Sequence, residues 1–124
     1  MDPKKILVID DDQNYLDTVA AMLQEAGYKV QACSKPEQGL AAVRTFQPHC
    51  LIMDLRMPII TGEKLLPWVR CQAPSLPVIV CTANEYDPVL LSNYGVRFIL
   101  RKPFSEEILF ESLEQAMARP RRAA

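Results

Sequence analysis

The chain has 124 residues, of which 49% are hydrophobic and 23% are charged. This size and balance predict one globular domain and exclude an intrinsically disordered chain. Fourteen basic and fifteen acidic side chains give a net charge of −1, so we expect no direct binding to nucleic acid or to an anionic membrane. No apolar run approaches the roughly 20 residues of a membrane span, and no signal-peptide pattern is present, which together predict a cytoplasmic protein.

Apolar runs of strand length alternate with segments of helical period along the chain. The first run, KILVID (5–10), precedes a helix that Asp12 is expected to cap and Gly27 to end. The second run, KVQAC (29–33), precedes a helix whose start is predicted at Ser34, because a glutamate three residues later completes a capping box.

The third run, CLIMD (50–54), is apolar until its final aspartate, which is typical of a strand buried on both faces. A helix with leucine and valine at helical spacing follows it. We expect Pro67 near the first turn of this helix and Trp68 partly buried in its packing.

The last part of the chain repeats the pattern twice more. The fourth run, PVIVCT (77–82), precedes a short and weakly patterned helix around residues 87–93. The fifth run, RFILR (97–101), precedes a helix that begins after the cap Ser105. We expect one domain over residues 1–118 and a basic tail or linker stub over 119–124.

Five β-then-α units predict a doubly wound parallel sheet with helices on both faces. Crossover connections between parallel strands are right-handed, so the carboxyl ends of all the strands meet at one edge of the sheet. Ligands bind to such sheets at this edge, where the strand order reverses.

Polar side chains stand at four of these strand ends, and topology should bring them together. Asp10 and Asp11 follow the first strand, Asp54 ends the third, Thr82 ends the fourth, and Lys102 follows the fifth. Two carboxylates about 4 Å apart repel by roughly 4 kcal/mol at an effective dielectric constant of 20, so the cluster favours a bound cation. Hard oxygen ligands with open positions suit Mg²⁺.

The same cluster has the groups that phosphoryl transfer requires. A carboxylate such as that of Asp54 can attack phosphorus and form an acyl phosphate. Mg²⁺ and Lys102 would neutralise the charge that develops on the phosphoryl oxygens, and the Thr82 hydroxyl would donate to one of them.

These residues resemble the receiver domain of two-component response regulators, from residue 4 to about residue 118. Each motif alone is weak, whereas all of them in this order and spacing are specific. The matching motifs are DD at Asp10 and Asp11, MDLRMP with Asp54 and Pro58, Gly62, TA at Thr82 and Ala83, and KPF at Lys102, Pro103 and Phe104.

The resemblance implies a flavodoxin-like fold, with five strands in the order 2-1-3-4-5 and five helices. It implies that Asp54 is the phospho-acceptor and that Asp11 binds Mg²⁺ directly. Asp10 would bind the ion largely through water, and the backbone carbonyl of Arg56 would complete the protein's ligands. The domain would catalyse only its own phosphorylation and dephosphorylation and is not otherwise an enzyme.

The resemblance also implies partners and two further features of the site. Lys102 and Thr82 would contact the phosphoryl group, and the Lys102–Pro103 peptide bond would be cis. A histidine kinase or phosphotransfer protein would donate the phosphoryl group. The fourth helix, fifth strand and fifth helix would form the face that contacts an effector domain or a downstream protein, with a homodimer as a further option.

One departure from the family concerns the output. The family carries Tyr or Phe three residues before the lysine, but here that residue is Ile99. Strand alternation predicts that the neighbouring Phe98 faces the opposite side of the sheet. The segment between Thr82 and Lys102 is also slightly short for the family, which predicts a brief fourth helix.

Two alternatives remain open at this point. Ile99 favours a receiver-like interaction module that phosphorylation does not regulate. The pair Asp10-x-Asp12, with Thr82 and a later lysine, loosely resembles the aspartate-nucleophile phosphohydrolases of the haloacid-dehalogenase family. Asn14 departs from that motif, and the phosphohydrolase reading leaves Asp54 without a role.

Overall fold

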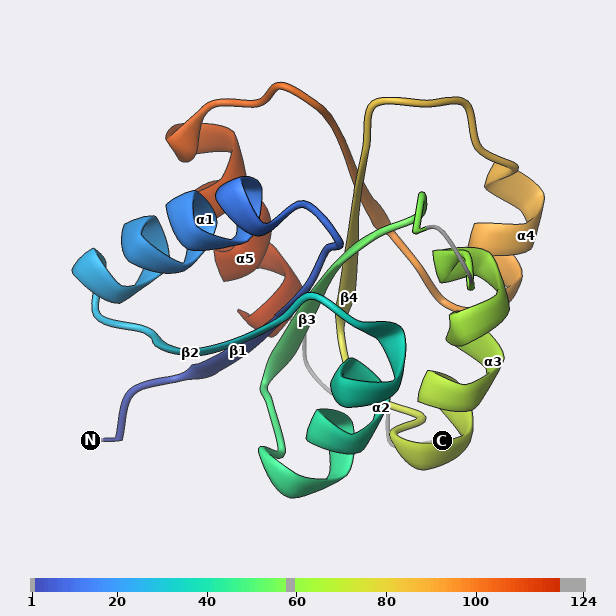
Figure 1. The fold of residues 1–124 in the computed structure, drawn as a ribbon, viewed down its shortest axis with the longest axis horizontal. Coiled ribbons are helices and arrows are strands. Elements are labelled where there is room, and N and C mark those ends of the chain that lie inside the picture. Colours follow the sequence, from blue (N-terminus) through green and yellow to red (C-terminus); the bar gives the residue numbers. More distant parts are fainter. Residues whose placement is uncertain (1, 58–59, 119–124) are drawn as a thin grey trace.

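A computed structural model describes residues 2–57 and 60–118 of the chain and consists of a parallel sheet between two layers of helices (Figure 1). The strand order is β2-β1-β3-β4-β5, which confirms the predicted order and fold class. The strands are β1 (Lys5–Ile9), β2 (Lys29–Cys33), β3 (Cys50–Asp54), β4 (Val78–Thr82) and β5 (Phe98–Arg101). The helices are α1 (Gln13–Glu25), α2 (Pro36–Thr45), α3 (Gly62–Gln72), α4 (Pro88–Asn93) and α5 (Glu106–Ala118).

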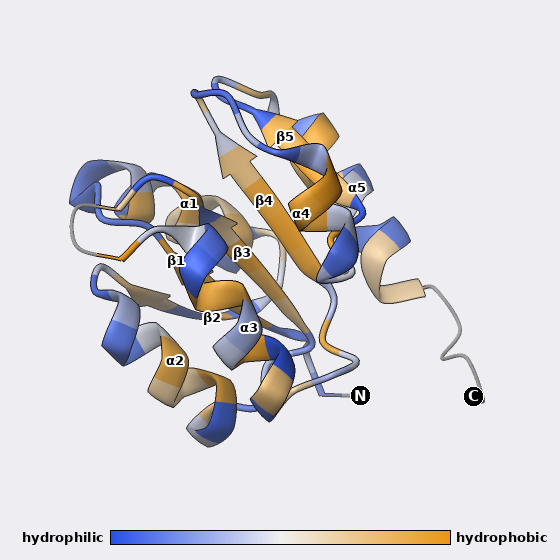
Figure 2. Ribbon diagram, turned by 90° about the vertical axis from the view of Figure 1, so that its right-hand side faces the viewer, coloured by the Kyte–Doolittle hydropathy of each residue, from blue (hydrophilic) through white to orange (hydrophobic). Residues whose placement is uncertain are grey.

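The hydrophobic core has two layers, one on each face of the sheet. Helices α1 and α5 cover one face, and α2, α3 and α4 cover the other (Figure 1). Every residue of β3 and β4 is buried, and these strands are among the most hydrophobic segments in Figure 2. Burial on both faces is the reason that their sequences read as unbroken apolar runs.

Two helix starts are capped by side chains as the sequence predicts, and a third, that of α4, is capped by a residue that is not among the predictions. Asp12 accepts a hydrogen bond from the backbone N–H of Tyr15 at 3.2 Å, and Asp87 caps α4 in the same way. The Ser105 hydroxyl accepts from the N–H of Ile108 at 3.2 Å. Each cap satisfies an N–H group that the first turn of a helix leaves without a partner.

The capping box predicted at Ser34 is wrong. Helix α2 begins at Pro36, after Lys35, and no side chain caps it. Proline is favourable at the first helical position, because its missing N–H needs no partner there and its fixed φ angle suits the helix. Pro36 therefore sets the start of this helix.

Two predictions about α3 are also wrong. The helix begins at Gly62 with Thr61 as its cap, so Pro67 lies inside the helix and not in its first turn. Trp68 is 64% exposed, not partly buried in the packing. The buried side of the helix is taken by Leu65, Leu66 and Val69, and Trp68 points away from it.

Near the carboxyl end, the predictions for β5 are confirmed. The Lys102–Pro103 peptide bond is cis. Ile99 packs against the core layer of α2, α3 and α4, whereas Phe98 packs against the opposite layer. Pro58, one of the motif residues, and the tail 119–124 lie outside the described residues, so the domain boundary at residue 118 stays a prediction.

Within residues 2–57 and 60–118, no helix is both long enough and apolar enough to cross a membrane.

Candidate functional site

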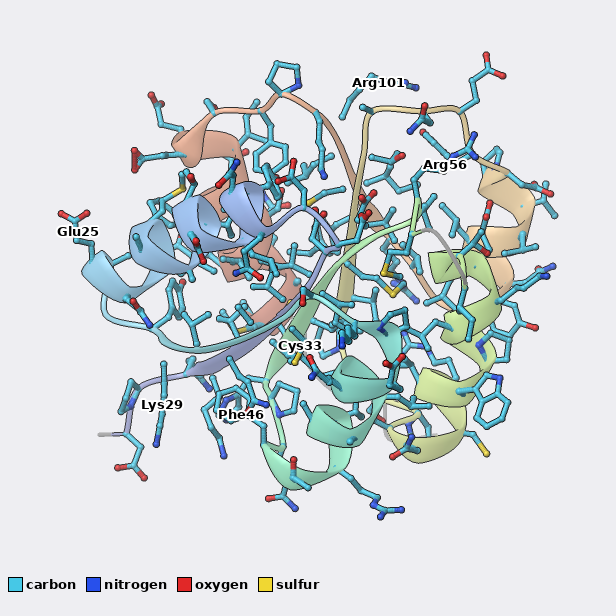
Figure 3. All side chains as sticks on the ribbon, viewed as in Figure 1. Glu25, Lys29, Cys33, Phe46, Arg56 and Arg101 are labelled. Carbon is cyan, nitrogen blue, oxygen red and sulfur yellow. The ribbon has the colours of Figure 1, made fainter. Side chains whose placement is uncertain are left out.

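The predicted site residues follow strands that end at the same edge of the sheet. The register pairs Ile9 of β1 with Met53 of β3, and Asp54 with Cys81 of β4, so β3 extends one residue beyond β1. Arg56 and Arg101, which are labelled in Figure 3, lie near this edge at the top of the view. The carboxyl ends of β1, β3, β4 and β5 thus bring residues far apart in the sequence into one place.

Short local turns orient the side chains at three of these strand ends. In each turn, a side-chain oxygen accepts a hydrogen bond from the backbone N–H two residues later, a pattern common after aspartate and threonine. The turns also leave the second oxygen of each aspartate available to the site. The three pairs are Asp10 with the N–H of Asp12 (3.0 Å), Asp54 with that of Arg56 (3.2 Å), and Thr82 with that of Asn84 (3.1 Å).

Lys102 connects the two buried carboxylates. Its Nζ atom lies 2.7 Å from Oδ2 of Asp10 and 3.5 Å from Oδ2 of Asp54. Its backbone N–H donates to the carbonyl of Thr82 at 2.9 Å, which ties the lysine to the end of β4. Burial alone would lower the pKa of Lys102, but the hydrogen bond to Asp10 and the charges of Asp10 and Asp54 outweigh it and raise the pKa.

Three carboxylates are arranged so that they can hold a metal ion. One oxygen each of Asp10, Asp11 and Asp54 lies within 4.8 Å of the others. Asp10 and Asp54 are buried, and Asp11 is exposed to solvent. The donor set consists of hard oxygens with three negative charges against one ammonium group, which fits a divalent cation.

The pKa of the Asp54 carboxyl is raised mainly by burial. Burial raises the pKa of the Asp54 carboxyl, and the charge of Asp10 raises it further, against the N–H of Arg56 and the ammonium of Lys102, which lower it. A second positive charge at the site would favour the ionised carboxylate, which is the form that can act as a nucleophile.

The structure therefore brings Asp10, Asp11, Asp54 and Lys102 together. Thr82 is fully buried at the end of β4, and its hydroxyl oxygen already accepts from Asn84, which leaves its own O–H group as a donor. The Asp12 side chain caps α1 and is not one of the three grouped carboxylates.

One residue of the site is not predicted by the sequence analysis. The ring of Tyr15, on the first turn of α1, lies 4.0 Å from Nζ of Lys102, measured to the ring centroid. The only sequence signal is an aromatic residue three positions after the helix cap Asp12. That position places a side chain over the start of the helix, next to the end of β1.

Comparison with known proteins agrees with the fold and the site. Residues 6–114 match the family described as the response regulator receiver domain. The fold is similar to that of a CheY-like receiver domain protein from Methanospirillum hungatei JF-1, with a TM-score of 0.89, 26% identity, and coverage of 93% of this chain and 94% of that one. The chemotaxis protein CheY4 of Vibrio cholerae gives a TM-score of 0.85 at 28% identity, with 92% and 98% of the two chains covered.

Two curated relatives differ in how much of their length is matched. The transcriptional regulatory protein PhoP of Bacillus subtilis (strain 168), which is named for alkaline phosphatase synthesis, is 32% identical over 104 residues. That match covers 82% of this chain and 43% of the relative, so this chain spans less than half of PhoP. Protein PilH of Pseudomonas aeruginosa is 29% identical over 118 residues, which cover 92% of this chain and 98% of PilH.

The parallel sheet, the three grouped carboxylates and Lys102 define a phospho-acceptor type of signalling site, and this chain belongs to the response regulator receiver domain family. A receiver domain is a switch in two-component signalling and not a true enzyme, which removes the phosphohydrolase alternative.

Proposed function

We propose that Asp54 accepts a phosphoryl group from the phosphohistidine of a histidine kinase or phosphotransfer protein, in the cytoplasm, and that Mg²⁺ is required. The observation that carries this proposal is the position of Lys102, whose ammonium lies between the buried carboxylates of Asp10 and Asp54. An ammonium group in this position can contact the oxygens of a phosphoryl group on Asp54 without a large movement of the chain.

The metal would be held by residues already close together. Asp11 and Asp54 would bind Mg²⁺ directly, Asp10 would bind it largely through water, and the backbone carbonyl of Arg56 would be a further ligand. The grouping of the three carboxylates within 4.8 Å supports this assignment. When bound, Mg²⁺ supplies positive charge that offsets the charge on the transferring phosphoryl oxygens.

The protein's own groups then have defined roles. An oxygen of Asp54 attacks phosphorus, the P–N bond to the donor histidine breaks, and the electron pair of that bond returns to the imidazole. Lys102 moves its contact from the Asp54 carboxylate to a phosphoryl oxygen, and the Thr82 hydroxyl donates to another. The free O–H group of Thr82 supports its role as donor.

The output would pass through the face formed by α4, β5 and α5, to an effector domain, a downstream protein or a second copy of the chain. Val89 of α4 is 67% exposed and Ile108 of α5 is 49% exposed, so both helices offer apolar surface to a partner. Complete switching between two states needs a bias of about 5.5 kcal/mol from the phosphoryl group.

Mixing the protein with acetyl phosphate and Mg²⁺ and measuring its intact mass tests this proposal. We expect one phosphoryl adduct on the wild-type protein and none on Asp54→Asn. Asp12→Asn is the matched control, because it also neutralises a carboxylate at this edge and asparagine still caps a helix. An adduct that persists in Asp54→Asn, or no adduct on the wild-type protein, contradicts the proposal.

A second function is favoured by Ile99, which takes the place of an aromatic residue and packs into the core layer of α2, α3 and α4. A receiver fold with this residue would act as an interaction module that phosphorylation does not regulate. Titration with Mg²⁺ separates the two functions, because a module without a phosphorylation site has no need to bind the ion.

A further inference from the structure

The ammonium group of Lys102 has a third neighbour besides Asp10 and Asp54. Its Nζ atom lies 4.0 Å from the centroid of the Tyr15 ring. A cation within about 6 Å of an aromatic face is attracted to the negative charge density of the ring. The ammonium therefore contacts two carboxylates and an aromatic ring.

The ring of Tyr15 is itself held in place. Phe104, two residues after Lys102, meets it edge to face, with the ring centroids 6.1 Å apart and an angle of 88° between the planes. Both rings pack against the core layer of α1 and α5. The aromatic surface under the ammonium is thus part of the packed core and not a mobile side chain.

Fixing a lysine side chain costs more conformational entropy than fixing most other side chains, so a contact that holds its ammonium in place matters more. Its ammonium is carried on four flexible methylene groups, and fixing them costs about 2 kcal/mol of side-chain entropy. Asp10 and Asp54 attract the ammonium, but a bound Mg²⁺ would compete for the same oxygens. The neutral ring of Tyr15 attracts the ammonium and is not a ligand that Mg²⁺ takes.

The hydroxyl group of Tyr15 has no comparable contact. Its oxygen is buried and has no hydrogen-bond partner among the described residues. Burial raises the pKa of this hydroxyl, and the nearby acidic groups of Cys81, Asp10 and Asp54 raise it further, so the side chain is neutral. The face of the ring, and not the hydroxyl, is what contacts Lys102.

We propose that Tyr15 is a positioning residue whose ring face holds the Lys102 ammonium beside Asp54, ready to contact an incoming phosphoryl group. This inference rests on the proposed function for its effect on rate, whereas the contact itself does not depend on phosphorylation. A tyrosine that only fills the core would affect stability and leave Lys102 unchanged.

The rate of phosphorylation by acetyl phosphate is the first test. We expect Tyr15→Leu to be about three- to tenfold slower than the wild-type protein, and Tyr15→Phe to rescue most of that loss, since it retains the ring. The concentration of Mg²⁺ that gives half the maximal rate should stay the same in both variants. Tyr28→Leu is the control, because Tyr28 packs against the same core layer but does not contact Lys102.

A double-mutant cycle shows whether Tyr15 acts through Lys102. In a Lys102→Met background, Tyr15→Leu should change the residual rate by less than about twofold, because the cation is gone. An equal slowing in both backgrounds, or an equal loss in Tyr15→Phe and Tyr15→Leu, overturns the proposal.

Nuclear magnetic resonance of the unphosphorylated protein gives a test that needs no phosphoryl donor. Protons held over an aromatic face are shifted upfield, so we expect this for the ε-methylene protons of Lys102 and not for those of Lys64. Tyr15→Phe should keep the shift. Signals of Lys102 at the ordinary lysine position overturn the inference, even if phosphorylation proceeds. The upfield shift on a protein that acetyl phosphate fails to modify contradicts the proposed function and leaves the contact established.

Discussion

Two half-buried cations lie at different ends of the sheet, and their partners differ in kind. Lys102 contacts the carboxylates of Asp10 and Asp54 at the carboxyl ends of the strands. Arg70 of α3 lies near the amino ends of β4 and β5, where its guanidinium donates to backbone carbonyls: Leu76 at 2.5 Å, Tyr94 at 2.6 Å, Ala73 at 3.4 Å and Pro74 at 3.5 Å.

This difference in partners indicates that Arg70 is a structural cation and Lys102 a functional one. Burial lowers the pKa of Arg70, and its carbonyl partners belong to the loops that precede β4 and β5, so the side chain ties these loops together. Lys102 is shared between two charged groups, one of which is the expected nucleophile. Removing Arg70 should therefore damage stability, and removing Lys102 should damage the chemistry.

Lys102→Met should have the largest effect. Loss of one group that stabilises charge in a transition state typically slows a reaction by about 10²- to 10³-fold, so we expect phosphorylation by acetyl phosphate to slow by that amount. Time courses of adduct formation by intact mass, at saturating Mg²⁺, measure the rate. A variant within threefold of the wild-type rate would remove Lys102 from the mechanism.

Arg70→Met should have the next largest effect, on folding. Hydrogen bonds from a charged donor contribute about 1.5–3 kcal/mol, so losing these contacts should reduce the free energy of unfolding by about 3 kcal/mol. Urea unfolding measures the change, and the phosphorylation rate of the folded variant should match the wild type. If this variant unfolds at the wild-type urea concentration, Arg70 does not tie the two loops.

Gly62→Ala should affect both stability and chemistry. A Cβ atom at this residue would lie 2.8 Å from the backbone carbonyl of Asp54 and 3.0 Å from the Cα atom of Leu55. Relieving the overlap must move the backbone that carries the nucleophile, at a cost of about 2 kcal/mol.

Gly27→Ala is the matched control for this change. Gly27 has a φ angle of 101°, but nothing lies within 4 Å of an added Cβ atom there. This substitution should destabilise the fold by about 1 kcal/mol, through backbone strain, and leave the rate of phosphorylation unchanged. Equal effects of the two alanines on the rate would show that Gly62 has no special relation to Asp54.

Asp54→Asn should have a small effect on stability, and of the opposite sign. Burial first, and then the charge of Asp10, raise the pKa of Asp54 in the folded state above its unfolded value. Its contribution to stability is present below the unfolded pKa and is lost as the pH rises through the folded pKa. At pH 7 without Mg²⁺, the variant should therefore be more stable than the wild type by about 1 kcal/mol.

The pH dependence of unfolding checks the sign of this prediction. The advantage of Asp54→Asn should shrink as the pH falls and Asp54 of the wild-type protein becomes protonated. Added Mg²⁺ should also reduce it, because the ion binds the wild-type carboxylate. A variant that is less stable than the wild type at pH 7 without Mg²⁺ would mean that Lys102 outweighs burial and Asp10.

The sequence predicts the strands and the edge at which the site forms, because these depend on local patterns and on one topological rule. Five apolar runs and five helical segments give the order of elements, and parallel strands must bring Asp10, Asp54, Thr82 and Lys102 to one edge. The observed bounds of the five strands differ from the predicted runs by one residue at most.

The contacts within the site depend on interatomic distances, which the pattern of apolar and polar residues in the sequence does not give. Lys102 lies closer to Asp10 than to Asp54, at 2.7 Å against 3.5 Å, and no spacing in the sequence gives this difference. The ring of Tyr15 reaches Lys102 because the first turn of α1 meets the segment after β5, where Phe104 contacts the same ring. Gly62 matters because α3 starts against the backbone of Asp54. The wrong prediction of burial for Trp68 has the same cause, because the start of α3 decides which side chains of that helix are buried.

Locating the phosphoryl group on the chain tests the central claim most directly. Borohydride reduces an acyl phosphate to an alcohol, so treating the phosphorylated protein with it marks the modified aspartate for peptide mass spectrometry. We expect a single reduced residue, at Asp54, formed only when Mg²⁺ is present. A reduced residue at Asp10 or Asp11, or none in a protein that has received the phosphoryl group, would contradict the account.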